Sequence, residues 1–447
     1  MPPSANPLLS GPILPTLLRL TLPNLIAMLA TALVAVAETS YIGRLGTDPL
    51  AAMALVFPMV MLTQMMSSGA MGGGVSSAIS RALGNRDEQR ANTLAVHAVV
   101  IGTLAGLAFT AFFLSAGPTV YRLLGGQGGA LAQATAYSNM VFSGVVAIWL
   151  VNTLASIVRG TGNMLVPSAT ILLVAILQIA IGGTLGLGLG PFPRLGMPGV
   201  ALGQIGAFTV GLVVLFAFLR SGRGRLTLRL RGTALQREMF FDILKVGALA
   251  CLSPLQSVLT ILVFTGLVAR FGTEALAGYG IGARLEFLLI PIAFAVGVAS
   301  VPMVGMAIGA GDVPRARRVA WTAGGLSAIA LGIVGLAFAI WPDGWARLFT
   351  SDPGVLEATR LYLRWAGPGF GFFGLGLCLY FASQGSGRVL GPVLAATARL
   401  ILVAVAGWLL ARAGAPLWAM FALVAVAMVA YGILTAAAIY LTSWRRG

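Results

Sequence analysis

Charged side chains are scarce in this sequence, which excludes an ordinary soluble protein. Only 9% of the 447 residues are Asp, Glu, Lys or Arg, against about 25% in soluble domains, whereas 58% are hydrophobic and the mean hydropathy is +0.95. The apolar runs are continuous, so they lack the alternation over about ten residues that a transmembrane β-barrel needs. We count about twelve runs of about 20 residues, each long enough to cross a hydrocarbon core of about 30 Å as a helix. The sequence therefore predicts an all-α integral membrane protein.

Histidine and cysteine are almost absent, which limits the chemistry of the chain. One histidine, His97, cannot build a histidine-based metal centre, and we expect it to be an interfacial residue near the cytoplasmic end of the third span. Cys251 and Cys378 lie in apolar runs and do not indicate a disulfide framework. The stretch GFGFFG, from Gly369 to Gly374, fits a GxGxxG pattern but lacks the preceding strand of a dinucleotide site. No cluster of His, Asp or Glu lies at a membrane face, so we expect no enzyme, no cofactor and no bound metal.

Acidic residues are outnumbered by basic ones, 12 against 28, which gives a formal net charge of +16. The basic residues gather in alternate loops, above all between Arg220 and Arg237, and only Arg284 and Arg399 fall inside predicted spans. By the positive-inside rule these loops face the cytoplasm, which also places both termini there. The charge does not form the extended basic face that nucleic-acid binding requires, so we expect the lipid bilayer as a partner and no nucleic acid.

An internal repeat organises the chain. The block IGRLGTDPLAA (Ile42–Ala52) corresponds to VARFGTEALAG (Val268–Gly278), and two further pairs follow in the same order: ALGNRDEQRA with AIGAGDVPRA, and RGTGNMLVP with QGSGRVLGP. The repeat predicts an N-terminal lobe of residues 1–220, a basic cytoplasmic connector of residues 221–236 and a C-terminal lobe of residues 237–447. Because each lobe holds an even number of spans, about six, we expect parallel repeats that alternate access by rocking.

The first apolar run carries an acidic residue, Glu38, with no basic residue within a helical turn of it. An acid inside a transmembrane helix costs about 2.5 to 3.5 kcal/mol, so such a residue indicates function. In the repeat Glu38 aligns with Phe264, so the shared fold does not require the carboxylate. We predict that Glu38 takes up and releases a proton, and Pro23 in the same run leaves a backbone carbonyl without its helical partner. The alternatives are a glutamate that snorkels to the interface and a signal peptide ending at Ala35-Val36-Ala37, against which the repeated counterpart of the run argues.

Other polar residues inside predicted spans are candidates for the wall of a substrate cavity. In the first lobe they are Tyr41, Gln64, Tyr137, Asn139, Asn152, Gln178 and Gln204. In the second lobe they are Gln256, Arg284 and Glu286. The alternative for each is a hydrogen bond that only bridges two helices. Arg284 and Glu286 are too close in sequence to face each other on one helix, so each would pair with a separate neighbour.

Several blocks of the sequence resemble the multidrug and toxic compound extrusion (MATE) family of secondary transporters. They are ETSYIGRLGTDPLAA after the first span, RALGNRDEQRA before the third, RGTGNMLVP between the fourth and fifth, and ARLEFLLIPIAFAVG in the eighth. The resemblance covers essentially the whole chain and is strongest for the DinF-like bacterial branch. It implies a V-shaped pair of six-helix bundles that exports amphipathic, often cationic compounds in exchange for H+ or Na+.

The resemblance also implies roles for individual residues. Glu38 matches a first-helix acid, usually Asp, that DinF-like members use for ion coupling, Pro23 matches the proline at which that helix bends, and Tyr137 matches a cavity tyrosine of the fourth helix. Three positions depart from the family pattern: Gln178 stands for Asn, Gly182 for Asp and Gln204 for Thr. The acids that NorM-like members carry in the seventh and tenth helices for Na+ are missing, which favours H+.

The resemblance therefore implies a proton-coupled multidrug antiporter of the bacterial inner membrane, with small organic substrates, no cofactor and a monomeric state. A Na+-coupled exporter of the same family is the first alternative. A lipid-linked precursor flippase of the wider superfamily is the second, although flippases usually carry a strongly cationic cavity and only Arg284 and Arg399 lie inside spans here.

Overall fold

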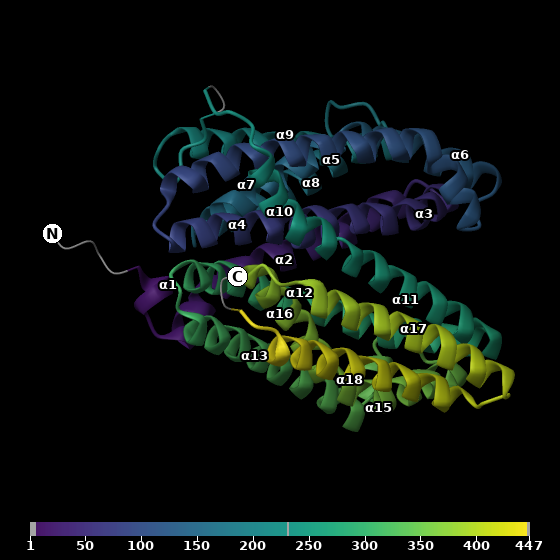
Figure 1. Ribbon diagram of the computed structural model, residues 1–447. Helices are drawn as coiled ribbons and strands as arrows, with labels where there is room; N and C mark the ends of the chain where they lie inside the picture. The colour runs from purple at the N-terminus through teal and green to yellow at the C-terminus, as the bar shows by residue number, and fades with distance from the viewer. Residues whose placement is uncertain (1–5, 230–231, 445–447) are drawn as a thin grey trace. The chain divides into compact units, whose positions relative to one another are not determined.

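The computed structural model describes residues 6–229 and 232–444, and every regular element in these ranges is a helix (Figure 1). Backbone packing divides the chain into two compact units. We call Leu22–Gly247 the N-terminal unit, and Ala248–Gly447 together with the residues up to Thr21 the C-terminal unit. The predicted lobes, 1–220 and 237–447 with the connector 221–236, follow the sequence repeat, and their bounds stay a prediction.

Each unit consists mainly of long helices. The N-terminal unit contains α3 (Thr47–Gln64), the π-helix η1 (Met65–Met71), α4 (Gly72–Gly84), α5 (Glu88–Leu123), α6 (Gly128–Ser143), α7 (Val145–Gly160), α8 (Leu165–Leu187) and α9 (Met197–Arg220). The C-terminal unit contains α1 (Pro7–Ser10), α11 (Leu252–Val268), η2 (Ala269–Phe271), α12 (Thr273–Gly309), α13 (Val313–Ile340), α14 (Asp343–Ala346), α15 (Pro353–Ala366), η3 (Gly367–Gly369), α16 (Phe370–Ser386), α17 (Leu390–Arg412) and α18 (Leu417–Leu441). Two helices, α2 (Ile13–Gly43) and α10 (Arg237–Ala250), have residues in both units.

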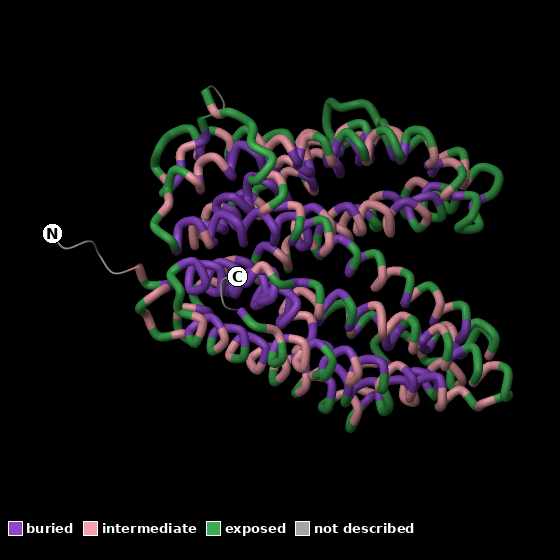
Figure 2. Tube along the Cα trace, in the orientation of Figure 1, coloured by how far each residue is buried: buried purple, intermediate pink, exposed green. Residues whose placement is uncertain are grey.

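The helices are long and apolar enough to cross a membrane. Within the described ranges eleven qualify, and the pair α6 and α7, bent by 45°, makes a twelfth. Many side chains on the outside of the helices are apolar too. Leu33 and Val36 of α2, for example, are 63% and 68% exposed, as expected where lipid surrounds a helix. Figure 2 shows α4 and α7 as almost wholly buried stretches of the N-terminal unit. The prediction of an all-α membrane protein is confirmed.

The sequence repeat reappears as equivalent local structure. Helices α5 and α13 each begin with a capping aspartate: Asp87 accepts a hydrogen bond of 2.8 Å from the backbone N–H of Arg90, and Asp312 accepts one of 2.9 Å from that of Arg315. The residue before each cap has a positive φ, 61° at Arg86 and 82° at Gly311. An aspartate at this position satisfies a backbone donor that the first turn of the helix leaves free, which explains why the repeated block keeps the acid.

Glycine brings α8 and α9 into backbone contact. A Cβ atom on Gly203 of α9 would lie 2.5 Å from the Cα atom of Gly182 on α8. Gly206, one turn further along α9, has nothing within 4 Å of the equivalent point. Small residues at such crossings are the usual way in which helices pack closely in lipid. The position of α8 therefore depends on Gly203 and not on Gly206.

Alanine substitutions on α9 test this contact. We expect Gly203→Ala to destabilise the protein by about 1 to 3 kcal/mol, because the added methyl group must push α8 and α9 apart. Gly206→Ala on the same helix is the matched control and should be neutral or slightly stabilising, since alanine favours helices. Thermal unfolding in detergent compares the two variants. Equal melting temperatures would show that α8 and α9 do not touch at Gly203.

Candidate functional site

Glu38 lies on α2 inside the N-terminal unit and is 6% exposed. Its Oε1 atom accepts a hydrogen bond of 2.7 Å from Nε2 of Gln178 on α8. A hydrogen bond to an ionised group is stronger than one between neutral groups, and low local polarity strengthens it further. This burial does not fit a glutamate that snorkels to the interface. The structure thus brings together two predicted site residues from distant parts of the chain.

Tyr137 and Tyr41 lie in the same unit as this pair. Tyr137 of α6 is buried and within electrostatic range of Glu38. The ring of Tyr41 packs on α8, where a Cβ atom on Gly183 would lie 2.8 Å from Cζ of the ring. Three elements, α2, α6 and α8, therefore contribute to the surroundings of Glu38.

A second polar network joins α3, η1 and α7. Nδ2 of Asn152 donates to Oε1 of Gln64 at 2.9 Å and to Oγ of Ser67 at 2.8 Å. Ser67 belongs to the π-helix η1, and such wide turns often occur at functional sites. Sequence reasoning missed Ser67, although it follows Gln64 by three residues and such spacing places two residues on one helix face.

The remaining first-lobe candidates make no hydrogen bond to either of these networks in the part of the chain that the structure describes. Oδ1 of Asn139 on α6 is buried and has no hydrogen-bond partner within the described ranges. Gln204 on α9 is buried as well. Gly182, where the resemblance expects an acid, faces Val200 of α9 at ordinary van der Waals distance, so this position packs two helices together.

Pro23 lies inside α2, one residue after the start of the N-terminal unit at Leu22. Proline has no N–H, so the carbonyl four residues earlier, at Arg19, loses its helical partner. The next residue, Asn24, is fully buried, and neither polar atom of its side chain has a hydrogen-bond partner in the described part of the chain. No pattern in the sequence indicated Asn24, because an isolated asparagine beside a proline reads as ordinary helix.

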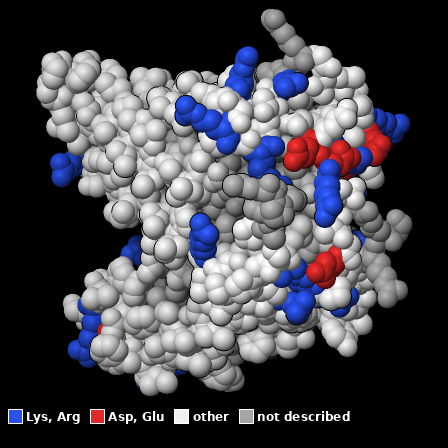
Figure 3. All heavy atoms as spheres, turned by 90° about the vertical axis from the view of Figure 1, so that its left-hand side faces the viewer, with Lys and Arg blue, Asp and Glu red and all other residues white. Residues whose placement is uncertain are grey.

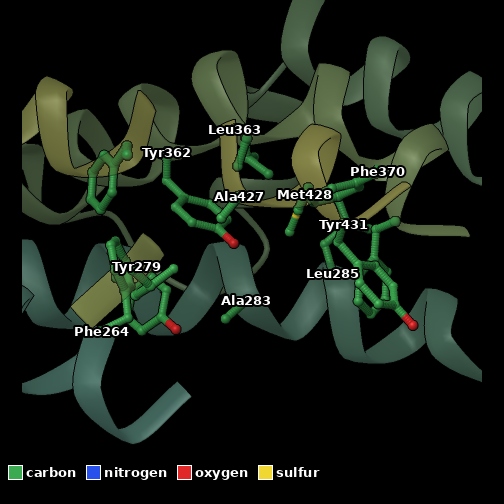
Figure 4. Packing of buried hydrophobic residues seen from close by; sticks show 14 of the residues in the cluster. Phe264, Tyr279, Ala283, Leu285, Tyr362, Leu363, Phe370, Ala427, Met428 and Tyr431 are labelled. Carbon is green, nitrogen blue, oxygen red and sulfur yellow. The ribbon is translucent and has the colours of Figure 1, made fainter. Parts of the chain in front are cut away.

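In the C-terminal unit the predicted residues Glu286 and Arg284 turn to different neighbours. Glu286 of α12 accepts a hydrogen bond of 3.2 Å from the hydroxyl of Tyr362 on α15, whose ring packs edge-on against Tyr279 with centroids 5.4 Å apart (Figure 4). Arg284 is exposed, with its guanidinium carbon 5.5 Å from the centroid of the Phe349 ring. The two residues therefore do not pair with each other.

Arg399 and Gln256 complete the polar groups of this unit. Arg399 of α17 lies within electrostatic range of Glu286 and over two rings, 5.3 Å from the centroid of Phe373 and 5.4 Å from that of Tyr431. Gln256 of α11 donates to Oγ1 of Thr397 on α17 at 2.7 Å. Sequence reasoning noted Arg399 only as a basic residue inside a span and missed Tyr362, because neither contact is visible along the chain.

His97 is fully buried within the protein, and its expected position at the membrane interface stays a prediction. Its Nδ1 lies 2.8 Å from the carbonyl of Thr93, and its Nε2 accepts a hydrogen bond of 2.7 Å from the backbone N–H of Gln236. A neutral imidazole with one N–H satisfies both contacts. Cys251 and Cys378 are buried and form no disulfide in the described part of the chain, which also contains no group of three or more His, Cys, Asp or Glu that could hold a metal ion.

The Asn152 network yields a prediction about stability. We expect Asn152→Leu to cost about 1 to 3 kcal/mol, because the substitution removes two hydrogen bonds and leaves the Gln64 and Ser67 oxygens without their donor. Asn139→Leu is the matched control and should cost less, since its buried Oδ1 makes no hydrogen bond. The measurement is thermal unfolding of both variants in the same detergent. A loss as large in Asn139→Leu would contradict the assigned network.

Comparison with known proteins identifies relatives along nearly the whole chain. The sequence model of the MatE family matches residues 23–183 and 250–409, one match in each repeat and together well over half of the chain. The chain is 26% identical over 401 residues to the FAD transporter of Shewanella oneidensis, covering 89% of this chain and 87% of that one. It is 25% identical over 379 residues to the probable multidrug resistance protein NorM of Thermotoga maritima, covering 85% and 81%.

Solved structures share the fold. A MOP superfamily transporter from Pyrococcus furiosus has a TM-score of 0.88 at 22% identity, covering 96% of this chain and 95% of that one. A multidrug resistance MATE family transporter in an outward-facing conformation has a TM-score of 0.87 at 23% identity, covering 98% and 97%. With the same fold, the two matched repeats and relatives that span most of its length, the chain belongs to the MATE family of membrane transporters.

Proposed function

We propose that the chain is a proton-coupled antiporter of the bacterial inner membrane that exports small organic compounds, cationic or amphipathic, by alternating access between its repeats. Membership of the MATE family supports multidrug efflux. The observation that carries proton coupling is the buried Glu38 carboxylate, whose hydrogen-bond partner is the neutral amide of Gln178. A monomer with cytoplasmic termini belongs to the same proposal, since the basic loops favour that orientation.

A proton suits this carboxylate better than a sodium ion does. Gln178 turns its N–H group to Glu38, and a donor does not supply the oxygen ligands that a hard cation prefers. Among the described residues, no lysine or arginine stabilises the negative charge of Glu38. No fixed positive charge therefore holds the acid in its ionised form, and it is free to gain and lose a proton.

In the proposed cycle, proton and substrate compete for Glu38. A cationic substrate binds while the carboxylate is charged, and a proton from outside removes the charge that holds the substrate. The first helix then bends at Pro23, where the helical hydrogen bonds are already interrupted. Because each ligand lowers the protein's affinity for the other, their binding is linked. This linkage alone couples the two movements into an exchange.

The decisive substitution is Glu38→Gln, which keeps the shape of the side chain and removes its charge. In proteoliposomes we expect a pH gradient, and not a sodium gradient, to drive efflux of a fluorescent organic cation by the wild type. Glu38→Gln should abolish the pH-driven efflux. Glu286→Gln, which removes a half-buried acid of the other unit, is the control and should retain it. Sodium-driven efflux that survives Glu38→Gln would overturn proton coupling at this residue.

A second candidate is export of a flat aromatic anion such as FAD. One relative over most of the chain is the FAD transporter of Shewanella oneidensis. The specific observation in this protein is Arg399, a half-buried guanidinium stacked over the rings of Phe373 and Tyr431. Arginine binds phosphate groups through two parallel hydrogen bonds and also stacks on aromatic faces, so such a site suits a phosphorylated aromatic compound.

Arg399→Gln separates the two candidates. If FAD is a substrate, we expect the variant to lower FAD efflux from loaded proteoliposomes by about tenfold, because the phosphate loses a charged partner. Efflux of an organic cation should remain. Arg284→Gln is the control, since that arginine is exposed and stacked on a single ring, and it should keep both activities. Failure of the wild type to move FAD, or undiminished FAD efflux by Arg399→Gln, would exclude this candidate.

A further inference from the structure

The helix that opens the second repeat, α10, packs on helices of the first repeat. Its residues up to Gly247 lie in the N-terminal unit, in contact with α4, η1 and α5. We call the contact made by residues 237–247 the α10 dock. The basic connector before α10 and the basic loop between α4 and α5 favour a cytoplasmic position for this dock.

An ion-pair network centred on Asp242 holds the α10 dock. Its carboxylate accepts hydrogen bonds from Arg81 of α4 at 2.9 Å and Arg90 of α5 at 3.2 Å, and it lies 2.9 Å from Nζ of Lys245. The side chain of Asp242 is only 14% exposed, whereas that of Glu238, which Arg90 also binds, is 70% exposed. Figure 3 shows acidic side chains lying among basic ones on the face in view.

The charge balance of the network makes Asp242 its central member. An isolated exposed ion pair contributes little to stability. Asp242 is different because it is shielded from water and serves three cations at once. Without its charge, Arg81, Arg90 and Lys245 would repel one another, and the partly buried Arg81 would lose its carboxylate partner, which is strongly unfavourable.

Close packing fixes the same contact. A Cβ atom on Gly74 of α4 would lie 2.7 Å from Cα of Gly247, and one on Gly247 would lie 2.6 Å from the sulfur of Met71. The ring of Phe240 packs edge-on against His97 of α5, with centroids 4.6 Å apart. Electrostatic attraction and steric fit therefore select one position of α10.

The other end of α10 is bonded within the C-terminal unit. The helix ends at Ala250, and α11 begins at Leu252 after the single residue Cys251. The hydroxyl of Tyr380 on α16 donates to the carbonyl of Ala250 at 3.0 Å. One helix is thus held by the first repeat at its start and by the second repeat at its end. Alternating access requires the repeats to move relative to each other, and α10 must take part in that motion.

We propose that Asp242 is a positioning residue of the transport cycle, which keeps the α10 dock closed until the cytoplasmic side opens. The inference rests on the proposed transport function and adds the residue that sets how readily this side opens. Asp242 acts through α10 and does not touch substrate. Its removal therefore changes the turnover number and leaves substrate affinity unchanged.

The first test measures the dock itself. Spin labels on cysteines placed at the exposed positions Gln89 of α5 and Arg237 of α10 report the distance across it. We expect Asp242→Asn to lower the ratio of short to long distances by about tenfold, because the network loses its central charge and the dock opens more often. Asp242→Glu should restore the short distance. Glu88→Gln, which neutralises an exposed acid on α5, is the matched control and should match the wild type.

A second variant opens the dock without changing any charge. Gly74→Ala places a methyl group against the backbone of Gly247 and should also lengthen the distance, whereas Gly206→Ala, in open space, should not. Unchanged distances in both Asp242→Asn and Gly74→Ala would overturn the proposal. Misfolding is recognised separately, since a misfolded variant would lose its sharp melting transition.

Transport by the same variants completes the test. We expect Asp242→Asn to change the turnover number for a fluorescent organic cation in proteoliposomes while its Kd stays at the wild-type value. An equal change in Kd would place Asp242 at the substrate site and overturn a positioning role. The distance measurement needs no substrate. A wild type that transports nothing while its dock responds as expected would therefore refute the proposed function and leave the dock standing.

Discussion

A charge inside a membrane persists only where the protein supplies the polar partner that lipid cannot. This constraint accounts for the two acids on which the N-terminal unit depends. Asp242 has three cationic partners and suits a permanent structural charge. Glu38 has the amide of Gln178, which stabilises the carboxylate without fixing its charge. The bond also depends on packing, because α8 can offer Gln178 only where Gly203 lets it lie against α9.

The sequence predicts the helices well because their determinants are local. Continuous apolar runs indicate the spans, and the repeated aspartates at Asp87 and Asp312 begin the third helix of each repeat. The cost of a buried acid singles out Glu38 in the same way. Its partner Gln178 is 140 residues away, so the pairing depends on how α2 and α8 pack, which no local pattern contains. The buried position of His97 has the same origin, since the covering N–H comes from Gln236, 139 residues further on.

The two repeats share a tyrosine and differ in the acid beside it. The blocks RGTGNMLVP and QGSGRVLGP set a register in which α8 corresponds to α17 and Tyr137 corresponds to Tyr362. Tyr137 lies within electrostatic range of Glu38 on α2, the first spanning helix of its repeat. Tyr362 donates to Glu286 on α12, the second spanning helix of its own. The same ring position therefore serves acids that come from different helices.

Each repeat carries apolar residues where the other carries its polar pair. The positions that correspond to Glu38 and Gln178 are Phe264 and Val403, and both belong to the buried apolar cluster of the C-terminal unit. Arg399 corresponds to Val174, which is buried in the N-terminal unit. Because every buried charge must be compensated, keeping one acid per repeat avoids a cost that a symmetric pair of sites would incur twice. The units consequently differ in chemistry on one shared scaffold: the first pairs its acid with a neutral amide, and the second sets its acid near an arginine.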